Sequence, residues 1–164
     1  LHLVRETVST EYAKRAEKLF SLKENPRFGY AYETLGWLCS VLSLKSDLGL
    51  RLREAYKAGD KAALKKAADD DIPKIIDYLE KFISAYRRQW YHENKTFGFI
   101  AQEIRLGGLT ERMRSVKMRL DDYAEGRTDR IEELETEPLP YSPDKVGNYH
   151  PHIGWRNILT AGQL

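Results

Sequence analysis

The chain has 164 residues, of which 41% are hydrophobic and 32% are charged, and its formal net charge is +2. This composition is typical of one soluble globular domain with its own core, and the balanced charge gives no basis for binding nucleic acid or an anionic membrane. No apolar run approaches the roughly 20 residues that cross a bilayer, and the only cysteine, Cys39, excludes an intramolecular disulfide framework.

The sequence begins at Leu1, and its only methionines are Met113 and Met118. Its first residues do not form the basic and then apolar segment of a secretion signal. We therefore expect a fragment of a longer cytoplasmic protein, with the chemistry carried by a part outside this chain.

Helical periodicity begins after an ambiguous stretch over residues 1–8. Ser9 or Thr10 is expected to cap a first helix that runs to about Lys23. Asn25-Pro26 then stops it, because the residue before a proline is disfavoured in the helical conformation.

A second, long helix is predicted over residues 28–58. Between residues 35 and 44 it is apolar nearly all round, which places it at the centre of the fold. Cys39 lies in this part, so we expect a buried structural thiol. Gly59 is expected to end the helix in the left-handed conformation.

A run of three aspartates follows a short predicted helix over residues 61–68, which Asp60 caps. Asp71 precedes Ile72-Pro73, so we expect it to cap the next helix. Capping explains the run better than a metal site, because no further ligands fall at calcium-loop spacing.

Two long amphipathic helices are predicted next. One covers residues 72–93, and the other begins near Leu109, ends at Gly126 and precedes a short acidic helix capped by Thr128. Each carries a continuous apolar stripe for packing. The stripes are Ile72, Ile75, Ile76, Leu79, Phe82, Ile83, Tyr86 and Trp90, and Leu109, Met113, Val116, Leu120 and Tyr123.

The segment over residues 94–108, between these helices, has a different character. It places aromatic and charged side chains around Gly98, Gly107 and Gly108. Because a glycine inside a helix costs about 1 kcal/mol relative to alanine, the adjacent pair predicts a bend or the close approach of another backbone.

Polar side chains around the start of this segment are candidates for binding a sugar. A tryptophan ring can stack on a sugar face while its polar neighbours bind hydroxyl groups, but a histidine and a lysine also suit the negative end of a helix. The sequence supports both explanations. The candidate substrate-binding residues are Trp90, His92, Glu93, Asn94, Lys95 and Arg105.

From residue 137 onward, prolines and glycines exclude a helix. We expect residues 1–136 to form a helical bundle, and residues 137–164 to form an extended tail that packs on the bundle or on a missing domain through Tyr141, Tyr149 and Trp155. The predicted fold class is all-α, a bundle of about four main helices with an extended C-terminal tail.

The sequence lacks the motifs of the common catalytic and cofactor sites. It has no Cys-x-x-Cys, no His-Glu-x-x-His and no glycine-rich phosphate loop. His150 and His152 flank a proline in the tail, where a solvated loop explains them better than a metal site. We predict neither a cofactor nor a metal.

Three motifs carry a family resemblance. The central one is Asn94-Lys95-x-Phe97-Gly98-Phe99-x-x-Gln102-x-Ile104-Arg105-Leu106-Gly107-Gly108-Leu109. The others are Lys45-x-Asp47-Leu48-Gly49 with Tyr56-Lys57-Ala58-Gly59-Asp60, and Trp155-x-x-Ile158-x-Thr160-x-x-x-Leu164. They resemble the helical C-terminal region of bacterial family 20 glycoside hydrolases, the β-N-acetylhexosaminidases, and the resemblance covers most of the chain.

The resemblance implies that a catalytic (β/α)8 barrel belongs to the same polypeptide. Such barrels carry an adjacent Asp-Glu pair that works with the acetamido group of an N-acetylhexosaminide substrate. This chain has no Asp-Glu dipeptide and lacks the alternating strands of a barrel. It therefore resembles the domain after the barrel, which is expected to pack on the barrel and on a second subunit.

The predicted function is a non-catalytic accessory domain that stabilises the barrel and its dimer and shapes the rim of the sugar site. The alternative is a free-standing helical module that binds a protein partner through the surface of residues 90–105. An upstream, in-frame region coding for a barrel would distinguish the two.

Overall fold

A computed structural model describes residues 7–136 of the chain. This part is 79% helical and has no strands, which confirms the predicted all-α bundle. The predicted tail lies outside the described residues. No helix in the described part is both long and apolar enough to span a membrane. The helices are α1 Val8–Phe20, α2 Gly29–Lys45, α3 Leu48–Lys57, α4 Lys61–Lys66, the π-helix η1 Ala67–Asp71, α5 Ile72–Glu93, α6 Phe99–Ala124 and α7 Glu132–Glu135.

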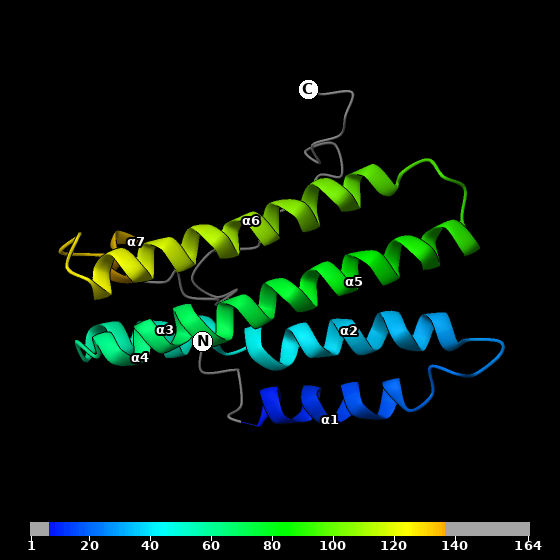
Figure 1. Cartoon of the computed structure of the whole chain (residues 1–164), viewed down its shortest axis with the longest axis horizontal. Helices are drawn as coiled ribbons and strands as arrows, with labels where there is room; N and C mark the ends of the chain where they lie inside the picture. The colour runs from blue at the N-terminus through cyan, green and yellow to red at the C-terminus, as the bar shows by residue number, and fades with distance from the viewer. Residues whose placement is uncertain (1–6, 137–164) are drawn as a thin grey trace, which may run out of the picture.

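The four long helices lie side by side in one layer, in the order α1, α2, α5 and α6 (Figure 1). Each packs mainly on the next one and runs antiparallel to it. The short helices α3, α4 and α7 gather at one end of this layer. The other end carries the α1–α2 and α5–α6 connections, and we call it the hairpin end.

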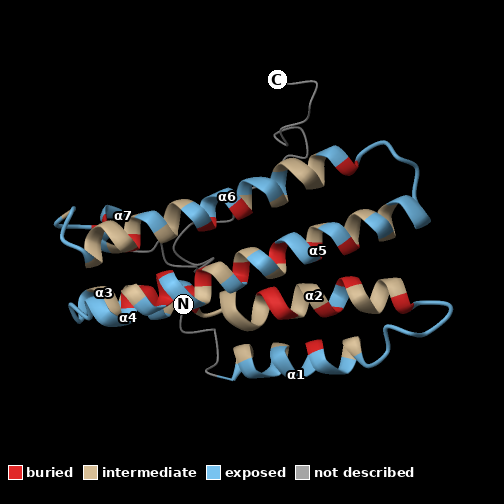
Figure 2. Cartoon of the chain, in the orientation of Figure 1, coloured by how far each residue is buried: buried red, intermediate tan, exposed pale blue. Residues whose placement is uncertain are grey.

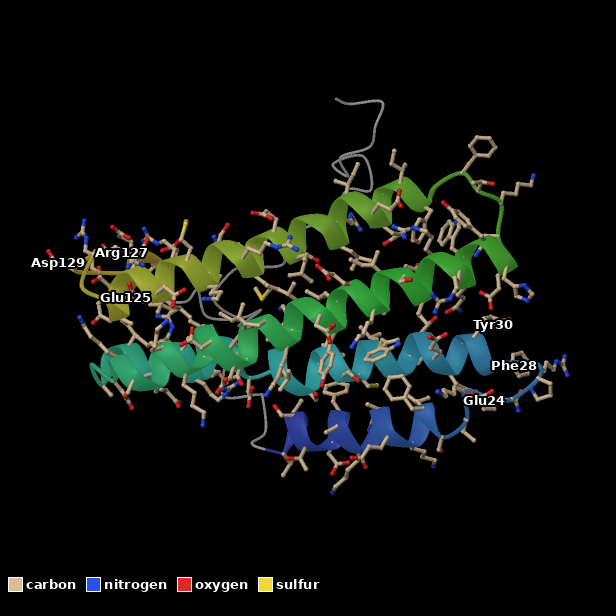
Figure 3. The ribbon with its side chains drawn as sticks, viewed as in Figure 1. Glu24, Phe28, Tyr30, Glu125, Arg127 and Asp129 are labelled. Atoms are coloured by element: carbon tan, nitrogen blue, oxygen red, sulfur yellow. The ribbon has the colours of Figure 1, made fainter. Side chains whose placement is uncertain are left out.

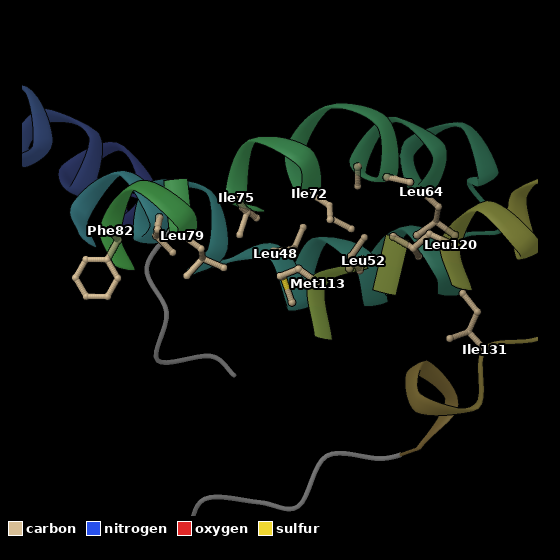
Figure 4. Close-up of a cluster of buried hydrophobic side chains, with 13 residues drawn as sticks. Leu48, Leu52, Leu64, Ile72, Ile75, Leu79, Phe82, Met113, Leu120 and Ile131 are labelled. Carbon is tan, nitrogen blue, oxygen red and sulfur yellow. The ribbon is translucent and has the colours of Figure 1, made fainter. Parts of the chain in front are cut away.

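The core extends from the end with the short helices to the middle of the layer (Figures 2 and 4). Ile72, Ile75 and Leu79 of α5 are buried there together with Leu64 of α4 and Leu120 of α6. A period of 3.6 residues places such side chains on one face of each helix. The apolar stripes predicted for α5 and α6 are therefore confirmed as the source of the core.

The single helix predicted over residues 28–58 is wrong, because the structure has two helices that part at Asp47. The Asp47 carbonyl accepts hydrogen bonds from two following backbone N–H groups, at 3.0 and 3.1 Å. Arg51 fixes this corner, since it pairs with the carboxylates of Asp47 (3.2 Å) and Asp71 (2.7 Å). The new direction buries Leu48, which is 4% exposed.

Asp71 does not cap the next helix as predicted, because η1 joins α4 to α5 with the helical backbone intact. Its carboxylate pairs with Arg51, and that of Asp69 pairs with Lys65 (3.0 Å). The predicted cap at Asp60 is confirmed, since its side chain accepts a hydrogen bond from a backbone N–H three residues on (2.9 Å).

The first and last described helices also begin differently from the prediction. Helix α1 begins at Val8, and Ser9 does not cap it. The Ser9 hydroxyl instead bonds to that of Ser46 (3.2 Å), which ties the start of α1 to the end of α2. Thr128 does not cap α7, because its hydroxyl donates to a nearby carbonyl, and α7 follows Ile131.

Helix α2 is central as predicted, between α1 and α5. Its buried residues are nevertheless small or of moderate size: Gly29, Thr34, Gly36, Ser40 and Val41. Cys39 is only half-buried, whereas a buried thiol was predicted. Its partial burial still raises the pKa of the thiol, because the thiolate is less well solvated there.

Candidate functional site

The α5–α6 hairpin carries five of the candidate residues near its tip. Helix α5 ends at Glu93, because the backbone of Asn94 is extended, and α6 begins directly after Gly98. Gly98 has a φ of 97°, in the left-handed region where a side chain would be strained. The tight reversal of the chain therefore requires glycine at this position.

Trp90 fastens the hairpin. Its indole Nε1 donates a hydrogen bond to the Lys95 carbonyl (2.9 Å), and its ring packs against Phe99 with centroids 5.6 Å apart. Phe99 is only 1% exposed and also contacts the rings of Tyr86 (5.6 Å) and Tyr91 (5.7 Å). Trp90 thus has a structural task in this chain, whatever it contributes to a sugar site.

His92 and Glu93 are positioned by a residue of α2, Tyr30, which Figure 3 places at the hairpin end. The interaction of the Tyr30 hydroxyl with the nearby Glu93 carboxylate raises the pKa of Tyr30, because the negative charge disfavours the phenolate. The Tyr30 ring also meets the His92 imidazole edge-on at 4.7 Å. Gln89 Nε2 donates to Glu93 as well (3.2 Å). Because Tyr30 lies far from this segment in sequence, no local pattern could identify it.

Arg105 lies apart from the other five candidates. It is exposed on α6, on the side that carries Arg112 and Arg119 at intervals of seven residues. Arg119 pairs with Glu132 of α7 (2.5 Å), and Arg112 approaches Glu133 (3.8 Å). Among residues 7–136, no hydrogen bond or salt bridge joins Arg105 to another side chain.

Gly107 and Gly108 continue α6 without interruption, so the predicted bend is wrong. A Cβ atom added to either glycine would meet nothing within 4 Å, so no described residue makes the predicted close approach. A close approach occurs instead at Gly36, where a Cβ would lie 2.7 Å from the ring of Phe20.

The hairpin tip is an exposed surface of mixed chemistry. His92, Glu93, Asn94 and Lys95 are all exposed. Three apolar side chains beside them are exposed as well: Tyr91 (50%), Phe97 (89%) and Ile100 (44%). Such a surface can supply hydrogen-bonding groups and apolar contacts to a site that another domain or subunit completes.

The sequence matches the family described as the Glycoside Hydrolase 20C C-terminal domain over residues 2–153. The chain belongs to this family. The match spans every described helix, and it confirms the resemblance seen in the sequence motifs. Membership of a Glycoside Hydrolase 20C C-terminal domain family implies attachment to a catalytic domain in the same polypeptide. No curated protein matches the sequence.

Proposed function

We propose that the chain is the accessory domain of a β-N-acetylhexosaminidase and that its hairpin tip forms part of the rim of the sugar site. The rim belongs to the catalytic domain of the same polypeptide or to that of a neighbouring subunit. The catalytic domain performs the hydrolysis of the N-acetylhexosaminide, and this domain stabilises it. The observation that carries the proposal is the tip, where His92, Glu93, Asn94 and Lys95 remain exposed on a hairpin whose backbone Trp90 holds.

The polar groups at the tip suit the recognition of sugar hydroxyls. Glu93 accepts hydrogen bonds, Lys95 donates them, and His92 and Asn94 can do both. Trp90 and Tyr30 restrict this part of the hairpin before any ligand arrives. Restriction matters because each flexible side chain that is ordered on binding costs about 0.5–1.5 kcal/mol.

The apolar side chains at the tip support contact with a neighbour. Phe97 projects from the loop with 89% of its surface exposed, beside Tyr91 and Ile100. Large exposed apolar groups that cluster usually mark an interface. We therefore include a homo-oligomer in the proposal, with the tip covered by the catalytic domain or by a second subunit.

The proposal is tested by kinetics of the full-length enzyme on an aryl N-acetyl-β-glucosaminide. We expect Lys95→Ala to lower kcat/KM by about tenfold or more, about 1.4 kcal/mol, with the melting temperature nearly unchanged. An equal loss for Arg105→Ala would extend the rim of the sugar site from the tip along α6. Matched controls are Arg112→Ala on the same side of α6 and Lys57→Ala at the other end of the layer. Both controls should retain the wild-type kcat/KM.

A lower melting temperature with an unchanged kcat/KM would give Lys95 a structural role only and would remove the tip from the sugar site. The 164-residue chain alone should not turn over the substrate, because it has no Asp-Glu pair. Turnover that follows this chain through purification would contradict the accessory role.

A further inference from the structure

Helix α2 buries its smaller side chains and leaves larger ones in contact with water. On one side, Phe20 of α1 packs over Gly36, and on the side toward α5, Thr34 and Val41 are buried. Leu35 is 47% exposed and Phe28, just before the helix, is 43% exposed. A central helix normally buries its leucines, but this apolar face of α2 is not covered by any of the described helices.

The exposed face has the pattern of a packed helix seam. Its residues follow one another at intervals of three, four, three and four, which places them on one side of a helix for about 21 Å. None of them is buried, although Leu38 touches the edge of the core. The α2 seam consists of Phe28, Ala31, Leu35, Leu38 and Leu42.

We propose that the α2 seam is the surface on which the catalytic domain of the same polypeptide docks. The inference rests on the attachment to a catalytic domain that the proposed function uses, but not on any contact between the hairpin tip and substrate. A seam of this spacing receives side chains of a facing helix between its own. The docking element of the catalytic domain is therefore an apolar helix.

The path of the chain favours the catalytic domain over a second copy as the occupant. The chain enters the described region at Thr7, and the Ser9 hydroxyl bonds to that of Ser46 (3.2 Å). Ser46 lies one turn beyond Leu42, so the chain enters beside the end of the α2 seam.

The matched family is that of a C-terminal domain, so the catalytic domain precedes this chain in the polypeptide and is joined to it on the side of Thr7. A covalent connection raises the effective concentration of the catalytic domain near the seam, which favours docking even through weak apolar packing. A second copy has no such connection to this end of α2, so we take the catalytic domain as the occupant.

Cysteine labelling tests the proposal. Leu35→Cys and, as a matched control, Met118→Cys are each introduced into a Cys39→Ser background. Met118 is 58% exposed on the outer side of α6. Each variant is treated with N-ethylmaleimide in the full polypeptide and in the 164-residue chain, and the labelled peptide is quantified by mass spectrometry.

We expect the new thiol of Leu35→Cys to react at least tenfold more slowly in the full polypeptide than in the 164-residue chain. That of Met118→Cys should react at similar rates in both. Equal rates for Leu35→Cys would overturn the proposal. Protection within the 164-residue chain that is lost on dilution would also overturn it, because a second copy would then be the occupant.

A charge substitution provides an independent measurement. Leu35→Asp should lower the melting temperature of the full polypeptide or split its calorimetric transition in two, while the 164-residue chain retains its helical circular dichroism. A full polypeptide with an unchanged transition would contradict docking at the seam. These results are separable from the kinetics, since Leu35→Cys can be protected even where Lys95→Ala leaves kcat/KM unchanged.

Discussion

The two ends of the helical layer differ in how many of their apolar side chains are buried by contacts within the described residues. At the end with the short helices, Leu64, Ile72 and Leu120 are fully buried. Lys65 there pairs with Asp69 (3.0 Å) and Asp121 (2.8 Å). At the hairpin end, Phe99 is fully buried, but the apolar side chains around the tip remain exposed.

The domain thus separates the region that forms its core from the region that leaves apolar side chains exposed. The end with the short helices contributes most of the buried apolar cluster of the described residues. The hairpin end and the α2 seam then carry apolar surface that the fold does not need for itself. Contacts to another domain can form there without disturbing the core.

The largest expected effect concerns Phe99, the centre of the aromatic cluster at the hairpin end. Phe99→Ala should lower the free energy of unfolding by about 3–5 kcal/mol, because it removes a buried ring and leaves a cavity. Urea denaturation of the 164-residue chain measures this. A loss confined to hydrogen exchange of the hairpin, with global stability unchanged, would show that the two ends do not unfold together.

A paired substitution compares the two ends directly. Ile75→Ala removes a fully buried side chain and should cost about 2–5 kcal/mol in the 164-residue chain. Ile100→Ala, at a position 44% exposed, should cost less than about 1 kcal/mol there. Denaturation of the full polypeptide sharpens the comparison, since a partner that covers the hairpin end should make Ile100→Ala more costly. Similar losses for both variants in the 164-residue chain would contradict the difference between the ends.

The end with the short helices could be predicted well from the sequence, and the hairpin end less well. The spacing of Ile72, Ile75 and Leu79 defines a buried face by helical geometry alone, so the core of α5 followed from the pattern. The corner at Asp47 did not, because it depends on Arg51 reaching Asp71 after the chain has folded. The local periodicity of apolar residues does not predict an ion pair between residues so far apart in the sequence.

The candidate site shows the same division. The hairpin reversal at Gly98 and the exposed polar tip follow from local residue types. The support from Tyr30 requires α2 and α5 to run side by side, which the sequence does not indicate. Candidate residues that come from one short segment of the sequence also need not meet in space, as the position of Arg105 on α6 shows.

Removal of an ion pair at the end with the short helices should have a smaller effect on stability. Burial alone would raise the pKa of Asp121, but Lys117 (2.6 Å) and Lys65 (2.8 Å) lower it below its usual value. A lowered carboxyl pKa stabilises the fold at neutral pH and loses this effect as the pH falls through it. Asp121→Asn should therefore cost about 1–2 kcal/mol at pH 7.

The cost of Asp121→Asn should shrink below about pH 4, where the wild-type carboxyl also becomes protonated. Urea denaturation of the wild type and the variant at pH 7 and at pH 3 measures this change. Asp77→Asn is the control, because Asp77 is half-exposed and pairs only with Lys81 (2.7 Å) among the described residues. A cost of Asp121→Asn that is equal at both pH values would exclude the ion pair as its cause.

The smallest expected effect is that of Gly107→Ala, which tests whether another domain packs on the exposed side of α6. Gly107 lies inside α6, and an added Cβ would meet nothing within 4 Å. Gly107→Ala should therefore stabilise the 164-residue chain by about 0.5–1 kcal/mol, since alanine loses less backbone entropy in a helix. Gly36→Ala is the opposite control, because its Cβ would clash with Phe20 at 2.7 Å and should destabilise the chain. In the full polypeptide the gain from Gly107→Ala should disappear or reverse if another backbone packs on this side of α6. A gain of equal size in both proteins would show that the glycine pair serves no contact, and the interface would then be limited to the hairpin tip and the α2 seam.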